Sequence, residues 1–381
     1  MKKYYLVLST GFAMFCMFFG SGNLVFPLVV GQESHGHFAL AAFGIFLTGV
    51  VVPFLGVLGM MLFQGNTNDF FRPFGKSATF WFPLLALSLM GPFGVLARCI
   101  TVAHGSLMRL IPNLPLTITS IAFCILIFLL TLKKNRIVPT LGLILTPFLL
   151  ISLMAIVILG FKNAELPLPT GDAFEAFQNG ILQGYQTMDL LAAFFFSTFI
   201  IRHLESHAQA KLNTSSLIKV FLKSALVGGG LLASVYIALV FLASMYSSSL
   251  IDVAPEQMLG AIADQVLGKL ASPIVCTAVV LACLTTAIVL AVLFADFLQK
   301  EVTSDKISNK QAMLVTLTIA FFISTLEFAG IAKFLGPIME LIYPALITLT
   351  LVNIGHKLWG IKNTPWPAAA TLLAKLGLTL G

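Results

Sequence analysis

The sequence predicts an all-α protein that crosses a membrane about ten times. Of its 381 residues, 58% are hydrophobic and only 10% are charged, whereas a soluble domain carries about 25% charged residues. The hydrophobic residues gather in blocks of roughly 20, the length at which a helix crosses about 30 Å of hydrocarbon. This composition excludes a soluble enzyme, a nucleic-acid-binding protein and a disordered protein.

Ten apolar windows predict the spans, and they are expected to be helical because lipid offers backbone groups no other partners. A single transmembrane domain is therefore expected over 1–381. The first window follows a short basic start without a cleavage site, so it is expected to be a membrane helix rather than a signal peptide. A shorter apolar segment follows the tenth window at 365–381. The windows lie at 5–30, 38–63, 79–104, 114–132, 138–161, 174–202, 217–246, 273–298, 312–328 and 334–353.

The loop charges predict that the N-terminus lies in the cytoplasm. With that orientation, sixteen of the 22 lysine and arginine residues fall in inner loops, four fall in outer loops and two lie within spans. Such an excess of basic residues is typical of cytoplasmic loops. The alternation also supports the span count, because a missed helix would scramble it downstream.

The first span is expected to break near its middle. Gly20-Ser21-Gly22-Asn23 interrupts the apolar run, and Pro27 follows. Glycine and proline weaken the helical hydrogen bonds, and the freed groups need another partner in hydrocarbon. A polar ligand is one such partner, since exposed N–H groups attract a carboxylate and exposed carbonyls attract a cation. A packing notch or a simple kink is the alternative.

The sixth span shows a matching interruption. Gly180 and the run 184–189, which ends in Asp189, separate two apolar stretches. A carboxylate inside a membrane is costly and indicates a functional site. The alternative is that Asp189 or Thr187 only caps the second half-helix.

The two breaks stand five spans apart, so the two broken helices enter the membrane from opposite sides. This predicts two five-helix repeats, 5–161 and 174–353, related by an in-plane pseudo-twofold axis. Inverted repeats with broken helices at the midplane are the plan of secondary transporters.

Four stretches resemble the bacterial branched-chain amino acid:cation symporters. They are Phe19–Pro27, Gly184–Ala193, Leu281–Ile288 and Ile342–Pro344, and the similarity runs from about Phe12 to Asn353. The resemblance implies a LeuT-type five-plus-five fold in the bacterial cytoplasmic (inner) membrane. It also implies uptake of leucine, isoleucine and valine with a cation.

The chain departs from the family pattern in three places. Ala97 precedes Arg98 where the family has proline, and His104-Gly105 stands where an acidic residue is usual. The family commonly has twelve spans, whereas an eleventh is the last one here. Because the ten core helices are present, transport activity is still expected.

The resemblance and the helix-end argument together place the substrate between the two breaks. Its carboxylate is expected at the N–H groups around Ser21 and Gly22, and its ammonium at carbonyls of residues 184–187 with Asp189 nearby. An apolar pocket of this kind separates aliphatic side chains by only about 1–3 kcal/mol per methylene, so methionine is a further candidate substrate. The expected substrate-binding residues are Phe18, Gly20, Ser21, Gly22, Asn23, Gly184, Tyr185, Thr187, Met188 and Asp189.

The coupling ion is expected at Phe19, Thr285 and Thr286, by the same resemblance. Threonine hydroxyls are ligands that suit sodium, although threonines in membrane helices often only bond a carbonyl of the preceding turn. Sodium is favoured, and a proton carried by Asp189 is the alternative. No cofactor and no metal other than the transported cation is expected.

Arg98 and Glu340 are further charges within spans, at matching depths on the expected outer side. An ion pair that gates the site is one interpretation, and two independent snorkelling side chains are the other. Among other classes, a pore would line a continuous polar path, and the metalloprotease and serine-hydrolase motifs of an intramembrane enzyme are missing. A non-enzymatic transporter is therefore predicted.

Overall fold

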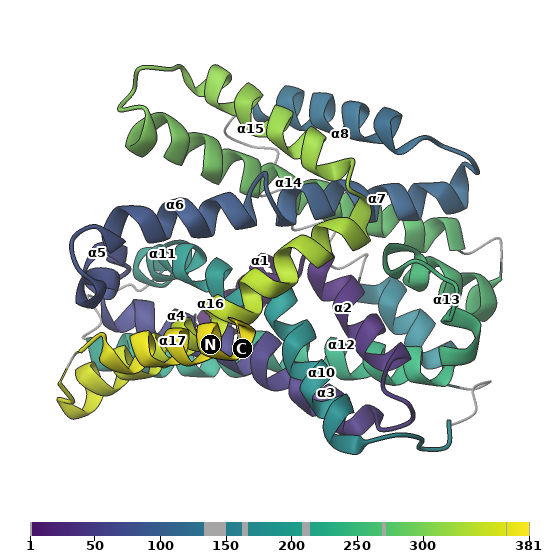
Figure 1. Ribbon diagram of the computed structural model, residues 1–381, viewed down its shortest axis with the longest axis horizontal. Coiled ribbons are helices and arrows are strands. Elements are labelled where there is room, and N and C mark those ends of the chain that lie inside the picture. Colours follow the sequence, from purple (N-terminus) through teal and green to yellow (C-terminus); the bar gives the residue numbers. More distant parts are fainter. Residues whose placement is uncertain are drawn as a thin grey trace.

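The computed structural model describes residues 2–132, 150–161, 167–207, 214–268, 272–362 and 364–380. Throughout these residues the regular structure is helical (Figure 1). In the first half of the chain the elements are α1 (Lys2–Phe18), α2 (Ser21–Gln32), α3 (Phe38–Phe46), η1 (Leu47–Val51), α4 (Val52–Leu62), α5 (Thr67–Phe71), η2 (Arg72–Phe74), α6 (Ala78–Met90), α7 (Val95–Leu110) and α8 (Leu116–Thr131).

The second half continues the same pattern after a further helix over Leu150–Gly160. Its elements are α10 (Ala173–Gln186), α11 (Asp189–His207), α12 (Thr214–Met245), η3 (Ser247–Leu250), η4 (Pro255–Gln257), α13 (Met258–Leu267), α14 (Ser272–Phe297), η5 (Leu298–Val302), α15 (Asn309–Ser324), α16 (Glu327–Trp359) and α17 (Trp366–Leu380).

Seven of the ten predicted spans are matched by helices or bent helix pairs of the described residues that are long and apolar enough to cross a membrane. The windows 114–132 and 312–328 contain shorter helices, α8 and α15. Five helical segments among the described residues are long and apolar enough to cross a membrane, and two bent pairs qualify as broken spans. The pairs are α1 with α2, bent by 73°, and α10 with α11, bent by 43°. Both breaks predicted from sequence are therefore confirmed. Of the predicted span 138–161, residues 138–149 lie outside the described residues.

The backbone changes direction sharply at each break. Gly20, between α1 and α2, is extended with φ −124° and ψ −164°. Met188, between α10 and α11, has φ +60°, in the left-handed region that non-glycine residues rarely adopt. Because each helix stops there, backbone groups at both breaks lose their intrahelical partners.

The helices pack in two groups, with the breaks where the groups meet. Helices α7, α8, α14 and α15 pack on one another, and α8, α14 and α15 form the upper part of Figure 1. The other group contains α1, α2, α3, α4, α10, α11 and α12. Helix α16 crosses the molecule diagonally and contacts α4, α7 and α10, so it joins both groups (Figure 1).

Glycines allow α3 and α10 to approach closely. A Cβ atom added at Gly44 or Gly180 would collide with the backbone of the facing helix, and one at Gly184 would collide with the Thr48 hydroxyl. Small residues at such contacts let membrane helices pack without a strong hydrophobic driving force. This contact holds the first half of the broken pair α10–α11 in place.

Candidate functional site: a cavity at the two helix breaks

A cavity lies where the two broken helix pairs meet. It contains about 360 Å³ of empty space, including the part that opens outward. Its walls come from the ends of α1 and α6, from the starts of α2, α7 and α11, and from the second half of α14. The lining residues are Met17, Phe18, Gly20, Ser21, Gly22, Asn23, Met90, Val95, Thr187, Met188, Asp189, Ala192, Phe196, Thr286 and Leu290.

One wall of the cavity is the N-terminus of α2. Ser21 is the first residue of this helix, and the first N–H groups of a helix have no intrahelical acceptor and carry a partial positive charge. The Gly20 N–H donates to Oδ1 of Asn23 at 3.0 Å, and the Ser21 hydroxyl lies 3.3 Å from Cys99 Sγ. The backbone N–H groups of Ser21 and Gly22 therefore border the cavity at the positive end of a helix.

A polar cluster of Asn23, Asp189 and Tyr236 joins three helices beside this wall. The amide of Asn23 donates to Asp189 Oδ2 at 2.6 Å and to the Tyr236 hydroxyl at 2.5 Å. The Tyr236 hydroxyl donates to the same Oδ2 at 3.2 Å. All three side chains are buried, with Asp189 only 4% exposed. The cluster thus fixes the carboxylate at the N-terminus of α11.

The carbonyls at the end of α10 already have donors. The Gly184 carbonyl accepts from the Thr187 hydroxyl at 2.9 Å, and the Tyr185 carbonyl accepts from the Met188 N–H at 3.1 Å. The Gln186 carbonyl accepts from Arg98 Nη1 at 2.7 Å. These three groups do not border the cavity, whereas Thr187, the fourth residue of the expected run 184–187, does.

The remaining cavity wall is apolar. It combines aromatic rings with flexible methionine and aliphatic side chains, which adapt to irregular shapes. The residues are Met17, Phe18, Met90, Val95, Met188, Ala192, Phe196 and Leu290. A polar end and an apolar wall in one cavity suit a small amphiphilic ligand.

Arg98 does not line the cavity and contacts the last residue of α10, Gln186. Its Nη1 and Nη2 donate to the main-chain oxygen and to Oε1 of Gln186, at 2.7 and 2.6 Å. The guanidinium group lies over the rings of Phe26 and Phe328, at 5.0 and 5.8 Å from their centroids. Arg98 is 1% exposed, whereas Gln186 is half-buried.

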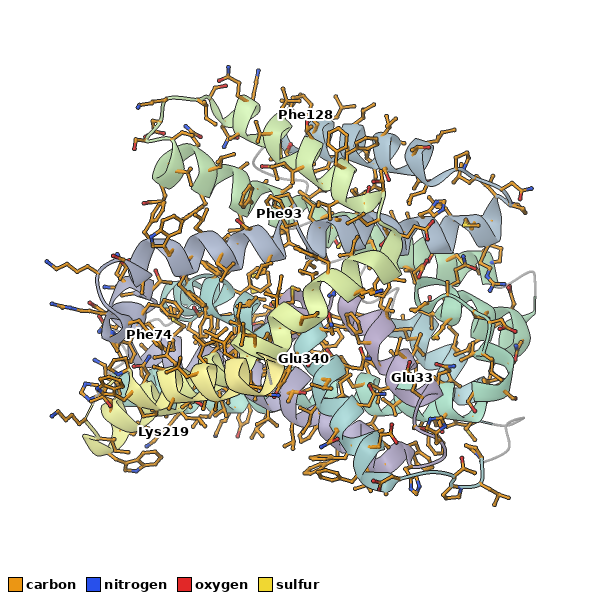
Figure 2. The ribbon with its side chains drawn as sticks, in the orientation of Figure 1. Glu33, Phe74, Phe93, Phe128, Lys219 and Glu340 are labelled. Atoms are coloured by element: carbon orange, nitrogen blue, oxygen red, sulfur yellow. The ribbon has the colours of Figure 1, made fainter. Side chains whose placement is uncertain are left out.

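The ion pair expected between Arg98 and Glu340 does not form. Across the described residues the one ion pair is Arg109–Asp264, at 3.3 Å. Glu340 is half-buried on α16, near the middle of the molecule in Figure 2. The break in α10–α11 explains the difference, because it frees a carbonyl beside an amide oxygen, and two acceptors match the planar fork of arginine.

Of the two threonines expected at the ion site, Thr286 borders the cavity and Thr285 does not. The Thr285 hydroxyl donates to the Ala282 carbonyl at 2.9 Å, which is the local bond considered as the alternative. Thr286 borders the cavity, and a Cβ atom at Gly20 would lie 3.3–3.5 Å from its side chain. Phe19 stacks on Phe15, with 4.9 Å between ring centroids.

Most of the expected site residues meet at the cavity. The exceptions are Gly184, which packs on Thr48, and Tyr185, which stacks on Tyr343 at 4.9 Å, together with Phe19 and Thr285. Tyr236 and Gln186, as well as Ala192 and Phe196 on the apolar wall, were not predicted from the sequence. Tyr236 could have been noticed in the sequence, since it lies well inside the apolar window 217–246, whereas the other tyrosine of that window, Tyr246, is its last residue.

Known proteins of similar sequence are carriers. A Pseudomonas aeruginosa protein named branched-chain amino acid transport system 3 carrier protein is 26% identical over 363 residues, covering 93% of this chain and 81% of the relative. A Staphylococcus haemolyticus protein, also named as a branched-chain amino acid carrier, is 28% identical over 365 residues, covering 90% and 80%.

Solved structures of similar fold are transporters at 14% sequence identity. Mhp1 in an inward-facing conformation gives a TM-score of 0.59 and covers 92% of this chain and 77% of that one. A manganese transporter of Eremococcus coleocola gives 0.57 and covers 98% and 85%. The fold is therefore the LeuT-type fold, as predicted.

The family of branched-chain amino acid transport proteins matches residues 3–378. This match covers nearly the whole chain and every residue of the cavity. The chain is thus a multi-pass membrane transporter and not an enzyme, and it belongs to the branched-chain amino acid transport protein family.

Proposed function

We propose that this protein imports leucine, isoleucine and valine, and also methionine, by symport with a cation, and that the cation is sodium. The family supports transport of branched-chain amino acids. The observation that carries the proposal is the cavity itself, which combines a helix N-terminus with an apolar wall. An amino acid with an aliphatic side chain needs both.

The substrate carboxylate binds at the N–H groups of Ser21 and Gly22, because these groups lack intrahelical acceptors and lie at the positive end of α2. The aliphatic side chain then lies against the apolar wall, near Phe18, Met188 and Ala192. No polar group in this wall distinguishes one aliphatic side chain from another, so several such amino acids are accepted.

We propose import across the bacterial inner membrane with the N-terminus in the cytoplasm, which is the orientation that the loop charges favour. Because Met17, Phe196 and Leu290 line the cavity, we take it to open on the same side of the breaks as that N-terminus. Arg98 and Gln186 occupy the opposite side. This arrangement corresponds to a carrier that is closed toward the outside, and import requires the contact between Arg98 and Gln186 to open.

Sodium binds beside Gly20, with the Thr286 hydroxyl as one ligand. This side chain borders the cavity and its hydroxyl makes no hydrogen bond to protein. The second candidate is proton coupling through Asp189, which is favoured by the burial of that carboxylate without a basic partner.

The test is uptake of labelled leucine into proteoliposomes, first under a sodium gradient and then under a pH gradient of equal size. Accumulation driven by sodium alone supports the proposal. Accumulation driven by protons alone supports the second candidate. Equilibration without accumulation under both gradients contradicts coupled transport.

A further inference from the structure

We infer that the α-ammonium group of the substrate binds to Asp189, that Asn23 and Tyr236 hold this carboxylate for it, and that the cluster selects compounds with a free amino group. The inference rests on the proposed transport of amino acids. Asp189 borders the cavity and offers the ammonium an acceptor there, which the carbonyls of residues 184–186 do not.

Few acceptor oxygens at the break between α10 and α11 face the cavity. An ammonium group has three donors and needs acceptor oxygens. The carbonyls of Gly184, Tyr185 and Gln186 each accept from a protein donor and do not border the cavity. Of the expected carbonyl run 184–187, only Thr187 borders it. Asp189 does border it. Asp189 is also the only ionisable side chain in the cavity lining.

The Asp189 carboxylate is held mainly through one of its two oxygens. Both Asn23 and Tyr236 contact Oδ2, while the Thr187 hydroxyl donates to the Gly184 carbonyl. The Thr187 side chain also contacts this carboxylate. All three neighbours are neutral, and neither Asn23 nor Tyr236 engages Oδ1, which is the oxygen that we assign to the ammonium. An ammonium there would form a charge-assisted hydrogen bond, the strong class of such bonds.

The charge of the Asp189 carboxylate is not balanced by a basic side chain in the cavity lining. A buried carboxylate without a cation is unfavourable in a low-dielectric site. The buried cation of this region, Arg98, donates to Gln186 instead. A bound ammonium supplies the missing positive charge. The carboxylate of the same substrate meets the N-terminus of α2, so both charged ends of the zwitterion are matched.

Tyr236 acts as a positioning residue. It reaches the cluster from α12, and its ring packs on Gly49, where a Cβ atom would lie 2.8 Å from Cε2. Its hydroxyl touches both Asn23 and Asp189. Without this hydroxyl the carboxylate has one neutral donor fewer and is oriented less firmly.

The experiment is a binding competition with purified protein in detergent, with labelled leucine as the probe. The competitors are leucine, 2-hydroxy-4-methylpentanoate, which replaces the amino group by a hydroxyl, and 3-methylbutylamine, which lacks the carboxylate. In the wild-type protein the hydroxy acid is expected to bind at least ~30-fold more weakly than leucine, as expected for loss of a hydrogen bond to a charged group.

The variant Asp189→Asn is expected to bind leucine about 30-fold more weakly, while its affinity for the hydroxy acid changes little. The ratio of the two affinities therefore collapses, which a general loss of structure would not produce. Tyr236→Phe should reduce the same ratio in part. Asp252→Asn, the same substitution at an exposed carboxylate, is the matched control and should leave the ratio unchanged.

Two results would overturn the inference. One is a wild-type protein that binds the hydroxy acid as tightly as leucine, a result that needs no variant to fold. The other is an Asp189→Asn protein that keeps the leucine affinity and its selectivity but loses accumulation, which would favour a proton carrier. Because binding needs no gradient, failure of coupled uptake would overturn the proposed function and leave the inference standing.

Discussion

Arg98 Nη1 and Nη2 lie 2.7 and 2.6 Å from the main-chain oxygen and the Oε1 atom of Gln186, so one side chain on α7 holds the last residue of α10 at two points. Since α7 and α10 belong to different packing groups, this contact ties the groups together on one side of the cavity. A carrier that alternates its access must break it.

Arg98→Lys is expected to loosen this contact, because lysine lacks the planar fork that reaches two acceptors. Cys99, next in sequence and fully buried, reports the change. In a protein that retains only this cysteine, a membrane-impermeant thiol reagent applied from outside should react ~10-fold faster or more. Arg109→Lys, at an exposed position of the same helix, is the control. Equal reaction rates in both proteins would contradict a gating role for Arg98.

Thr286→Ala is expected to raise the half-saturating sodium concentration for leucine uptake by ~10-fold or more, through loss of one oxygen ligand. Thr285→Ala should have a much smaller effect, because its hydroxyl is engaged with the Ala282 carbonyl. Thr286→Ser should restore most of the sodium affinity. Sodium titrations in proteoliposomes measure all three, and identical curves would exclude Thr286 as a ligand.

Ala192→Val is expected to shift selectivity toward smaller amino acids. The added methyl groups occupy cavity space beside the aliphatic side chain of the substrate. We expect leucine affinity to fall by about 5- to 150-fold relative to alanine, the range for one or two methylenes. Competition against labelled leucine measures the ratio. Ala329→Val, at an exposed position of α16, should not alter it, and an unchanged ratio in Ala192→Val would place the side chain elsewhere.

Gly184→Ala is expected to destabilise the protein by about 1–3 kcal/mol through overpacking, because the new Cβ atom would collide with the Thr48 hydroxyl. Gly230→Ala is the matched control, since no atom lies within 4 Å of its added Cβ. That control should be neutral or stabilise α12 by up to about 1 kcal/mol. Thermal unfolding in detergent compares them, and equal melting temperatures would show that α3 and α10 can move apart.

Glu256 predicts a dependence of stability on pH. This residue lies on η4, outside the spans, and its burial, together with nearby Glu327, raises its pKa above the usual 4.5. The folded state therefore disfavours the charged form. The penalty is absent at pH values below 4.5 and develops as the pH rises through the folded-state pKa.

The melting temperature should accordingly fall as the pH rises from about 4.5 through that pKa, and Glu256→Gln should reduce the fall. Glu175→Gln, at an exposed carboxylate of α10, should follow the wild-type curve. If Glu256→Gln also followed the wild-type curve, another group would have to account for the pH dependence.

The sequence by itself determined the membrane spans and the two breaks. Both depend on local patterns, since a run of about 20 apolar residues forms a helix in lipid whatever its neighbours are. Gly20 and the run 184–189 interrupt that helix wherever it packs. The helix ends at these breaks, together with the family resemblance, led to the prediction that Ser21, Gly22 and Asp189 lie at the site.

Only the tertiary structure decided which side chains meet at the breaks. Tyr236 lies 47 positions further along the chain than Asp189 and donates to it from another helix. Arg98 donates to Gln186 and not to Glu340. The matching depths of Arg98 and Glu340 in the membrane had suggested that they form an ion pair. Depth describes only the position along the membrane normal, whereas the rotation of each helix about its own axis decides which side chains face one another. That rotation is set by close contacts such as Gly184 on Thr48, which arise between helices and leave no periodic trace within either one.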